Sequence, residues 1–333
     1  MSYTVDELKG VYAMMPPFAT PDAHDIRARD TVDVDNLRAG VDRIIRDGVQ
    51  LLATTSGSGE GWNMLWEEYQ TLTRATIEVV NKRIPVFIGV TSANPREVVQ
   101  KMEFVREAGG EGVLLGLPYY HALSIPNVIA FYRTIAELFP DLSISIYHNP
   151  VEHKVHIPVS AWSEFVKQPN IIASKEGHRT PLEFMRLTDV TRGKAAHFPN
   201  QNQLYPYYEN GAAGCWSFDI WMGPWPVLRA YQAVVDGDNE TAKRVIKEMS
   251  SVRGGGGGGR DPVLMQEGGS GRTPQEIAGY IKPGPARPPH FEPHVGDKRA
   301  PQAVARWLEL CERYRPEVEA WRGAHGAGVA VPN

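Results

Sequence analysis

Cysteine is scarce in this sequence, and long apolar runs are absent. The 333 residues include two cysteines, Cys215 and Cys311, whose separation fits neither a disulfide framework nor a metal-ligand motif. We therefore expect free thiols. No apolar run approaches the roughly 20 residues that a membrane span needs. The amino terminus, MSYTVDELKG, is acidic and polar and does not resemble a signal peptide, so a cytoplasmic protein is expected.

The charge pattern also lacks any cluster or stripe of lysine and arginine. The formal net charge is −4, with 42% hydrophobic and 22% charged residues, which is ordinary globular composition. Nucleic acid is therefore not an expected partner, and neither is a membrane. The length fits one large α/β domain with extra elements, or two domains of ordinary size.

Short, nearly continuous apolar runs alternate with helical patterns through the first 220 residues. Such runs are typical of parallel strands that are buried on both faces, and the alternation predicts βαβ units. Eight units favour a (β/α)8 TIM barrel. A doubly wound sheet is the alternative, but the first strand ends in Met15-Pro16-Pro17, which cannot form the glycine-rich loop of that fold. The expected strands are 10–17, 50–55, 86–91, 112–118, 143–150, 171–177, 195–200 and 214–219.

The last third of the chain predicts a helical extension. We divide the chain into a catalytic barrel over residues 1–236 and a C-terminal helical extension over 237–333. Glycine-rich residues 254–271 lack the Gly-Lys-Ser/Thr ending of a phosphate-binding loop, so they are predicted to be a flexible connector. The proline-rich stretch 281–294 should lie extended on the surface. A final helix is expected over 300–314, with Val304, Trp307, Leu308 and Cys311 on one face.

The candidate catalytic residues lie where two neighbouring strands end. Catalytic groups of such barrels lie at the C-terminal ends of the strands. Lys175 follows four apolar or small residues, and burial favours its neutral, nucleophilic amine. Tyr147 ends the preceding strand and could move protons beside that amine. The structural alternatives are a lysine paired with Glu176 or another carboxylate at the barrel rim, and a tyrosine that only packs.

Two further groups of residues suggest binding sites. The turn Thr54-Thr55-Ser56-Gly57 follows the second strand, and its backbone N–H groups could hold a carboxylate, although a plain βα loop would have the same composition. Three histidines at 148, 153 and 156 lie close in sequence, but their spacing matches no zinc motif. No metal is therefore expected.

These motifs together resemble those of a known superfamily. The sequence Tyr147-His148-Asn149-Pro150, Lys175 at the end of the next strand, and Thr54-Thr55 followed by a Gly-Glu pair are similar to the N-acetylneuraminate lyase and dihydrodipicolinate synthase superfamily. The stretches at 17–33, 65–69, 96–99 and 278–289 resemble its hydratase-aldolase branch. That branch includes trans-o-hydroxybenzylidenepyruvate hydratase-aldolase and 2′-carboxybenzalpyruvate aldolase.

The resemblance implies a class I aldolase, a carbon–carbon lyase, on a (β/α)8 barrel. Lys175 matches the Schiff-base lysine and Tyr147 the proton-shuttling tyrosine, while Asn149 and Trp216 match pocket residues. Thr54, Thr55, Ser56 and Gly57 lie where the pyruvate carboxylate is held. The implied reaction converts aromatic benzylidenepyruvates to an aromatic aldehyde and pyruvate, or the reverse, in aromatic hydrocarbon degradation. No cofactor is implied beyond the covalent lysine adduct, and a homotetramer is expected.

Two glycine-rich segments depart from the family pattern. Family members read Gly-Thr/Ser-Phe-Gly-Glu-Cys where this chain reads Ser56-Gly57-Ser58-Gly59-Glu60-Gly61, and residues 254–273 replace a longer segment. Two alternative functions therefore stay open. One is a superfamily lyase or synthase that acts on an aliphatic 2-oxo acid, and the other is a catalytically weakened engineered variant that only binds 2-oxo acids.

Overall fold

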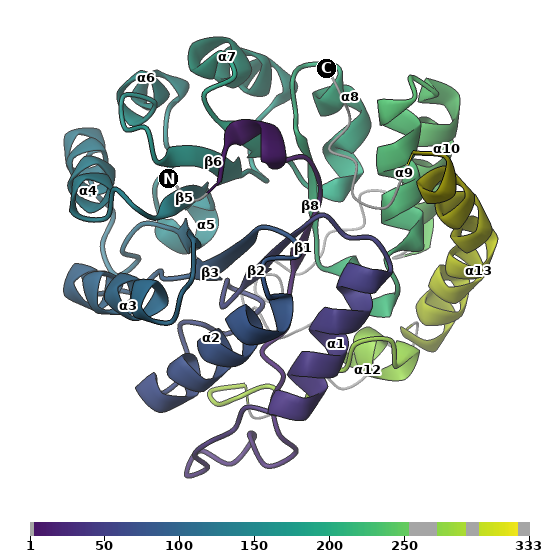
Figure 1. The fold of residues 1–333 in the computed structure, drawn as a ribbon, viewed down its shortest axis with the longest axis horizontal. Helices are drawn as coiled ribbons and strands as arrows, with labels where there is room; N and C mark the ends of the chain where they lie inside the picture. The colour runs from purple at the N-terminus through teal and green to yellow at the C-terminus, as the bar shows by residue number, and fades with distance from the viewer. Residues whose placement is uncertain (1–2, 253–271, 291–299, 326–333) are drawn as a thin grey trace.

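Eight parallel strands form the centre of the molecule, and the order of their pairing makes a barrel. The computed structural model describes residues 3–252, 272–290 and 300–325. The strands pair in the order β7-β6-β5-β4-β3-β2-β1-β8 (Figure 1). Between β7 and β8, Ala213 N–H donates to His197 O at 3.0 Å and Trp216 N–H donates to Pro199 O at 2.9 Å. The prediction of a (β/α)8 barrel is confirmed. Its strands are β1 (Gly10–Met14), β2 (Leu51–Thr54), β3 (Val86–Gly89), β4 (Gly112–Leu115), β5 (Ser143–Tyr147), β6 (Ile171–Lys175), β7 (Ala196–Phe198) and β8 (Gly214–Ser217).

Side chains alternate between the barrel interior and the layer under the helices. Because successive strand residues point to opposite faces, Leu51 and Ala53 of β2 belong to the inner apolar cluster while Leu52 belongs to the outer one. The same alternation places Tyr147 in the inner cluster and Ile146 in the outer one. Residues at the last inward position of each strand therefore converge at the C-terminal mouth of the barrel.

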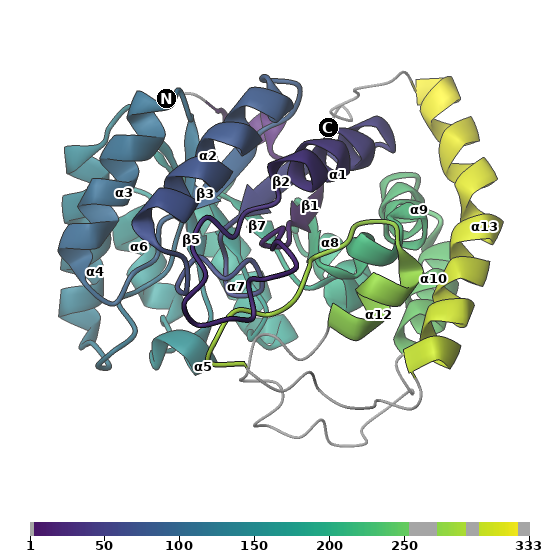
Figure 2. The ribbon, with the colours of Figure 1, turned by 90° about the horizontal axis from the view of Figure 1, so that it is seen from below.

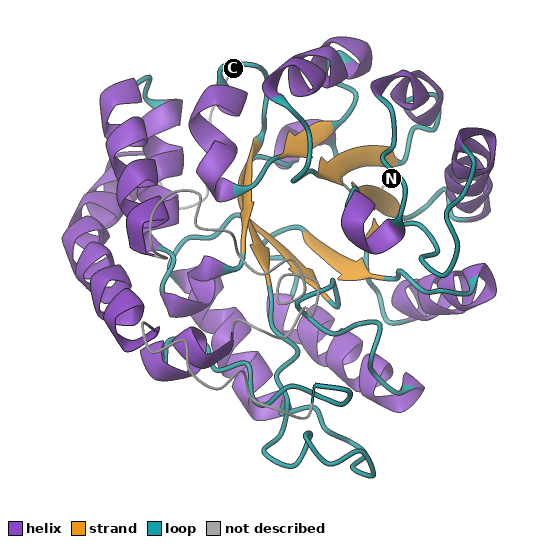
Figure 3. Cartoon of the chain, turned by 180° about the vertical axis from the view of Figure 1, so that it is seen from behind, coloured by secondary structure: helices purple, strands orange, loops and turns teal. Residues whose placement is uncertain are grey.

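Helices surround the strands on all sides in the view of Figure 3. The segments between the strands form helices, and the one between β5 and β6 includes a 3₁₀ turn (Val159–Ala161) followed by the short α6. Within the described residues, no helix is both long and apolar enough to cross a bilayer. The helices are α1 (Val34–Arg46), α2 (Trp66–Val80), α3 (Pro95–Glu107), α4 (Ile125–Leu138), α5 (Pro150–His153), α6 (Trp162–Phe165), α7 (Pro181–Thr191), α8 (Leu204–Tyr208), α9 (Trp225–Val235), α10 (Asn239–Val252), α12 (Arg272–Ala278) and α13 (Ala300–His325).

The last helix, α13, packs along the outside of α9 and α10 (Figure 2). It is longer than predicted, since it continues through Pro316 to His325. Its buried stripe includes Val304, Trp307 and Cys311, as expected, but Leu308 is 37% exposed and Leu310 is buried instead. The predicted connector over 254–271 lies outside the described residues. The division into residues 1–236 and 237–333 stays a prediction.

The segment that follows α12 is partly buried, whereas a surface stretch was predicted over 281–294, of which 291–294 lie outside the described residues. Residues 282–287 have no regular secondary structure, as predicted, but Ile281 is 1% exposed and Arg287 4% exposed. The Arg287 guanidinium contacts Glu60 Oε2 at 2.8 Å and Thr31 Oγ1 at 2.7 Å. Arg272 of α12 binds the other Glu60 oxygen. We call Glu60, Arg272 and Arg287 the Glu60 clamp, because they fasten the C-terminal chain to the loop after β2.

The Glu60 clamp generates a stability prediction. All three side chains are at most 8% exposed, so Glu60→Gln would leave two buried guanidinium groups without their shared counter-charge. Removing one partner of such a buried arrangement costs about 3–5 kcal/mol. We expect the free energy of unfolding, measured by urea titration with circular dichroism, to fall by that amount.

The matched control is Glu78→Gln, which breaks the exposed ion pair with Arg38. Exposed pairs contribute little, so this variant should unfold like the parent protein. Equal urea midpoints for Glu60→Gln and Glu78→Gln would contradict the interpretation of the clamp.

Candidate active site

Lys175 ends β6 with its amine at the mouth of the barrel, between two aromatic rings. Its Nζ lies 3.8 Å from the centroid of the Tyr147 ring and 4.3 Å from that of the Trp216 ring. The lysine is 7% exposed. Burial lowers the pKa of Lys175 from 10.5 to about 8, against a smaller opposing effect of the Glu152 carboxylate. About a tenth of the amine would be neutral at pH 7, roughly 300 times more than for an ordinary lysine.

Lys175 does not pair with Glu176, which was the structural alternative to a catalytic role. The Glu176 carboxylate instead binds His148 Nδ1 at 2.6 Å and Arg179 Nε at 2.8 Å. Burial raises the pKa of Glu176, but the charges of His148 and Arg179 outweigh burial and hold it at about 2. Because neighbouring residues of a strand point to opposite faces, this ionic cluster lies on the side of β6 away from the amine.

Tyr147 ends β5 directly beside Lys175, and the two residues are register partners in the sheet. The phenol donates to Glu152 Oε2 at 3.1 Å and accepts from Asn149 Nδ2 at 3.0 Å. Burial, with the Glu152 charge as a second cause, raises the pKa of Tyr147 well above 10. The phenol therefore stays protonated at neutral pH and can act as a proton donor.

Asn149 links the folding of the loop to the placement of the phenol. Its side-chain oxygen caps α5 by accepting from Val151 N at 3.2 Å and Glu152 N at 3.3 Å. Pro150 follows at the first helical position, where its missing N–H costs nothing. Because the side-chain oxygen of Asn149 caps the helix, its amide nitrogen faces the other way and donates to the Tyr147 oxygen.

The predictions did not include Glu152, which the structure brings to the phenol. It lies in the four-residue helix α5, five positions after Tyr147. A side chain at Gly57 would meet its carboxylate, because an ideal Cβ there would lie 2.8 Å from Glu152 Oε1. The sequence feature that could have indicated Glu152 is an acidic residue in the first helical turn after the Asn-Pro cap.

The loop after β2 brings Gly57 against Glu152 at the same mouth, but the two threonines before it have different environments. The strand alternation assigns Thr54 to the outer side, where its hydroxyl is buried with no hydrogen-bond partner among the described residues. Thr55 has a φ of 51°, a strained value for a β-branched residue, and its hydroxyl donates to Gly89 O at 2.9 Å. Gly59 packs on the backbone, since a Cβ there would lie 2.9 Å from Thr55 N and 3.2 Å from Ser56 N.

Trp216 of β8 completes the surroundings of the amine. Its indole N–H donates to the carbonyl oxygen of Glu176, the residue after Lys175, which fixes the ring over Nζ. The ring also stacks on Phe218 at a centroid distance of 6.3 Å. The amine therefore lies in an apolar, aromatic environment with one phenol beside it.

The three histidines near β5 contact three different residues. His148 binds Glu176, and His156 binds Glu183 at 3.0 Å. His153 packs edge-on against the Tyr147 ring, and burial, then the charge of Lys175, lowers its pKa to about 3. The described residues contain no group of three or more His, Cys, Asp or Glu side chains arranged as metal ligands.

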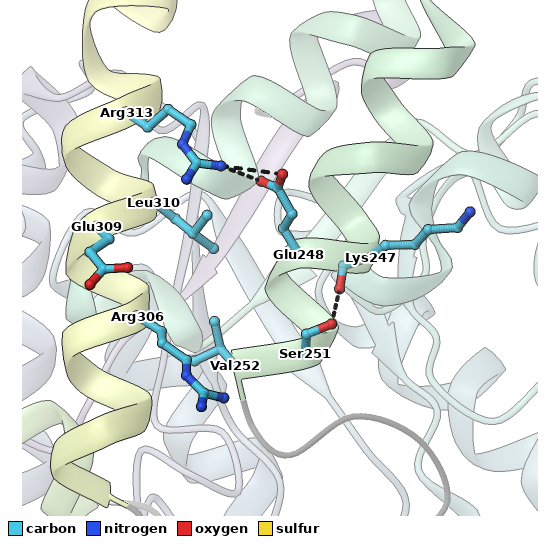
Figure 4. Close-up of a pocket in the computed structure, with 8 residues that line it drawn as sticks. All are labelled: Lys247, Glu248, Ser251, Val252, Arg306, Glu309, Leu310 and Arg313. Atoms are coloured by element: carbon cyan, nitrogen blue, oxygen red, sulfur yellow. Dashed lines mark hydrogen bonds and ion pairs between the residues drawn. The ribbon is translucent and has the colours of Figure 1, made fainter.

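A groove between α10 and α13 carries no comparable chemistry. Figure 4 shows that its lining comes from these two helices, with Arg313 paired to Glu248 and the Ser251 hydroxyl bonded to the Lys247 carbonyl. Its charged side chains are exposed or already partnered. The candidate active site is therefore the barrel mouth around Lys175.

Comparison with known proteins identifies the family of the chain. The family model "Dihydrodipicolinate synthetase family" matches residues 13–253. The chain belongs to this family. A trans-O-hydroxybenzylidenepyruvate hydratase-aldolase of Pseudomonas aeruginosa is 27% identical, covering 95% of this chain and 97% of that protein. A trans-2′-carboxybenzalpyruvate hydratase-aldolase of Nocardioides sp. (strain KP7) is 26% identical, covering 93% and 96%.

Solved structures extend the likeness to three dimensions. The structure of "PhdJ bound to substrate intermediate" superposes with a TM-score of 0.87 at 26% identity, covering 94% of this chain and 99% of that one. A 4-hydroxy-tetrahydrodipicolinate synthase of Methylacidiphilum fumariolicum SolV has a TM-score of 0.77 at 20% identity, which shows the shared fold. The predictions of the family and of a class I aldolase are confirmed.

The lowered pKa of Lys175 generates a prediction about its reactivity. Since only the neutral amine attacks carbonyl carbon, the rate of reductive methylation of Lys175 by formaldehyde and cyanoborohydride should rise tenfold per pH unit below pH 8. Above about pH 8 the rate should level off. Peptide mass spectrometry at a series of pH values, with Nα-acetyl-lysine as the reference amine, measures this. A rate for Lys175 that still climbs tenfold between pH 9 and 10 would show that burial does not lower its pKa.

Proposed function

We propose that this protein is a Schiff-base-forming, pyruvate-dependent hydratase-aldolase that cleaves or forms aromatic benzylidenepyruvates. The observation that carries the proposal is the buried Lys175 amine, with its pKa lowered to about 8, against the ring of a protonated Tyr147. The hydratase-aldolase names of relatives that cover almost the whole chain support the same reaction.

In this proposal Lys175 is the nucleophile and Tyr147 the proton donor. The neutral amine adds to the 2-oxo carbon, and the carbonyl oxygen leaves as water with one proton from the nitrogen and one from the phenol, which is reprotonated from solvent before the alkene is hydrated. The resulting iminium withdraws electrons from the conjugated alkene. Covalent catalysis of this kind divides a difficult C–C cleavage into easier steps.

Hydration and cleavage then follow on the lysine adduct. Water adds to the distal alkene carbon and gives up a proton, while the π electrons move to nitrogen to form an enamine. Protonation of the adjacent carbon restores the iminium. Loss of the new hydroxyl proton breaks the C–C bond and releases the aromatic aldehyde, and the enamine that remains is protonated and hydrolysed to pyruvate and free lysine.

The remaining predicted residues take binding roles in the proposal. The backbone of Thr55, Ser56 and Gly57 would hold the pyruvate carboxylate, and Gly59 keeps the first two amides uncovered by a side chain. Thr54 would contribute only its backbone. Trp216 would contact the substrate beside the amine, and Asn149 would keep the phenol in place. No further cofactor enters these steps, and a homotetramer in the cytoplasm remains the expected form.

A second candidate is a lyase or synthase that acts on an aliphatic 2-oxo acid. It is favoured by relatives named 4-hydroxy-tetrahydrodipicolinate synthase, one of them from Methanoculleus marisnigri at 25% identity over 72% of this chain. The altered loop with Gly57 and Ser58 motivates a third, an engineered variant that only binds 2-oxo acids. Turnover of benzylidenepyruvates, N-acetylneuraminate and aspartate semialdehyde separates the three, since a binding protein would convert none of them.

Trapping the adduct is the direct test of the proposal. Pyruvate with borohydride should add a reduced pyruvyl group to the peptide that contains Lys175, seen as a mass increase by mass spectrometry. Lys175→Arg keeps the positive charge but has no nucleophilic amine, so it should stay unlabelled and inactive.

Tyr147→Phe supplies the matched control, because it removes the phenol and leaves the amine in place. It should still be trapped, while cleavage of a benzylidenepyruvate slows about 10²–10⁴-fold, the usual contribution of a positioned acid–base group. A parent protein that is not labelled at Lys175 would end the Schiff-base proposal.

A further inference from the structure

The proposed function requires more of Tyr147 than its own ionisation can give. Two steps release a proton, when water adds to the alkene and when the C–C bond breaks. Two other steps take up a proton at carbon. A phenol whose pKa lies well above 10 can donate a proton, but it accepts none at neutral pH unless its own proton can leave at the same time. A second group must therefore receive that proton.

Glu152 is placed to be that group. Its Oε2 lies 3.1 Å from the Tyr147 oxygen, and since the carboxylate can only accept, the phenolic proton points toward it. Asn149 Nδ2 donates to the same oxygen from 3.0 Å, which occupies one lone pair and fixes the direction of the O–H bond. The lysine nitrogen lies 3.8 Å from the centroid of the same phenol ring, so the Tyr147–Glu152 hydrogen bond is part of the surroundings of the amine.

The exposure of these residues provides a path for the proton. Tyr147 is 6% exposed, whereas Glu152 is an exposed residue of α5. One end of the hydrogen bond therefore lies in the buried site and the other reaches solvent.

Gly57 makes room for this arrangement. A Cβ at position 57 would lie 2.8 Å from Glu152 Oε1, closer than real side chains approach, so any larger residue would displace the carboxylate. Gly57 therefore leaves the space that the carboxylate occupies.

We propose that Glu152 acts through Tyr147 as the proton-accepting partner that allows the phenol to work as a base as well as an acid. When water adds to the alkene carbon, its proton passes to the Tyr147 oxygen while the phenolic proton passes to Glu152. The water oxygen forms the new C–O bond, and the π electrons move to the iminium nitrogen. The carboxyl group then returns its proton through the phenol to the enamine carbon, so the pair ends each cycle unchanged. The same two transfers serve C–C cleavage and the release of pyruvate.

Exchange of the pyruvate methyl hydrogens tests this step without an aromatic substrate. The iminium of pyruvate loses a methyl proton through Tyr147 to become the enamine, which then takes up a proton from solvent by the same route, so the parent protein in D₂O should incorporate deuterium, followed by proton NMR. Glu152→Gln keeps the size of the side chain but accepts no proton, and we expect exchange to slow at least about 100-fold. Borohydride trapping at Lys175 should persist in this variant, and KM for a benzylidenepyruvate should change less than about threefold.

Two controls separate a proton-transfer role from a structural one. Glu164→Gln removes an exposed carboxylate of α6 that pairs with Lys167, and it should exchange like the parent. In Glu152→Ala, added formate should restore exchange in proportion to its concentration, because the position is open to solvent. Exchange by Glu152→Gln within threefold of the parent, or no response of Glu152→Ala to formate, would overturn this inference while leaving the Schiff-base proposal intact. A parent protein that is not trapped at Lys175 would instead refute the proposed function itself.

Discussion

The removal of one lysine amine from water is the constraint on which the site depends. Lys175 lies at the last inward position of β6, with the rings of Tyr147 and Trp216 on either side, and no carboxylate forms an ion pair with it in the described part of the chain. Aromatic faces attract a cation, but the loss of hydration outweighs that attraction, and the net effect is a pKa of about 8. The opposite environment lies one residue away, where Glu176 is held ionised by His148 and Arg179. Successive side chains of a strand point to opposite faces, so the environments of Lys175 and Glu176 differ although their Cα atoms are only about 4 Å apart.

Much of this could be predicted from the sequence because strands and their ends leave clear patterns. The eight apolar runs predicted the eight strands, and the residues that end two neighbouring strands indicated Lys175 and Tyr147, while Asn149 and Trp216 came from the family resemblance. Consecutive strands are neighbours in a parallel barrel, so their C-terminal ends come together at one mouth. Thr54 shows the limit of that reading, since its parity in β2 assigns its side chain to the outer layer.

The features that were missed depend on contacts between distant or irregular segments. Glu152 lies in a helix of four residues, too short to produce a periodic pattern. The proline-rich stretch after α12 carries no apolar periodicity. Its buried part is held by the ion pair between Arg287 and Glu60, and the composition of the stretch does not reveal that partner. Leu308 was placed on the buried face of α13 by apolar character alone, but the stripe through Trp307, Cys311 and Tyr314 follows the helical period and leaves it outside.

The Glu60 clamp joins positions 227 residues apart in the chain. A ribosome delivers Glu60 early and its two arginines late, and domains fold as their segments emerge. The loop after β2 therefore stays unclamped until α12 and the segment that follows it have been synthesised. A chain cut short by premature termination before Arg272 would contain Lys175 and all eight strands of the barrel, but not the clamp that fixes this loop.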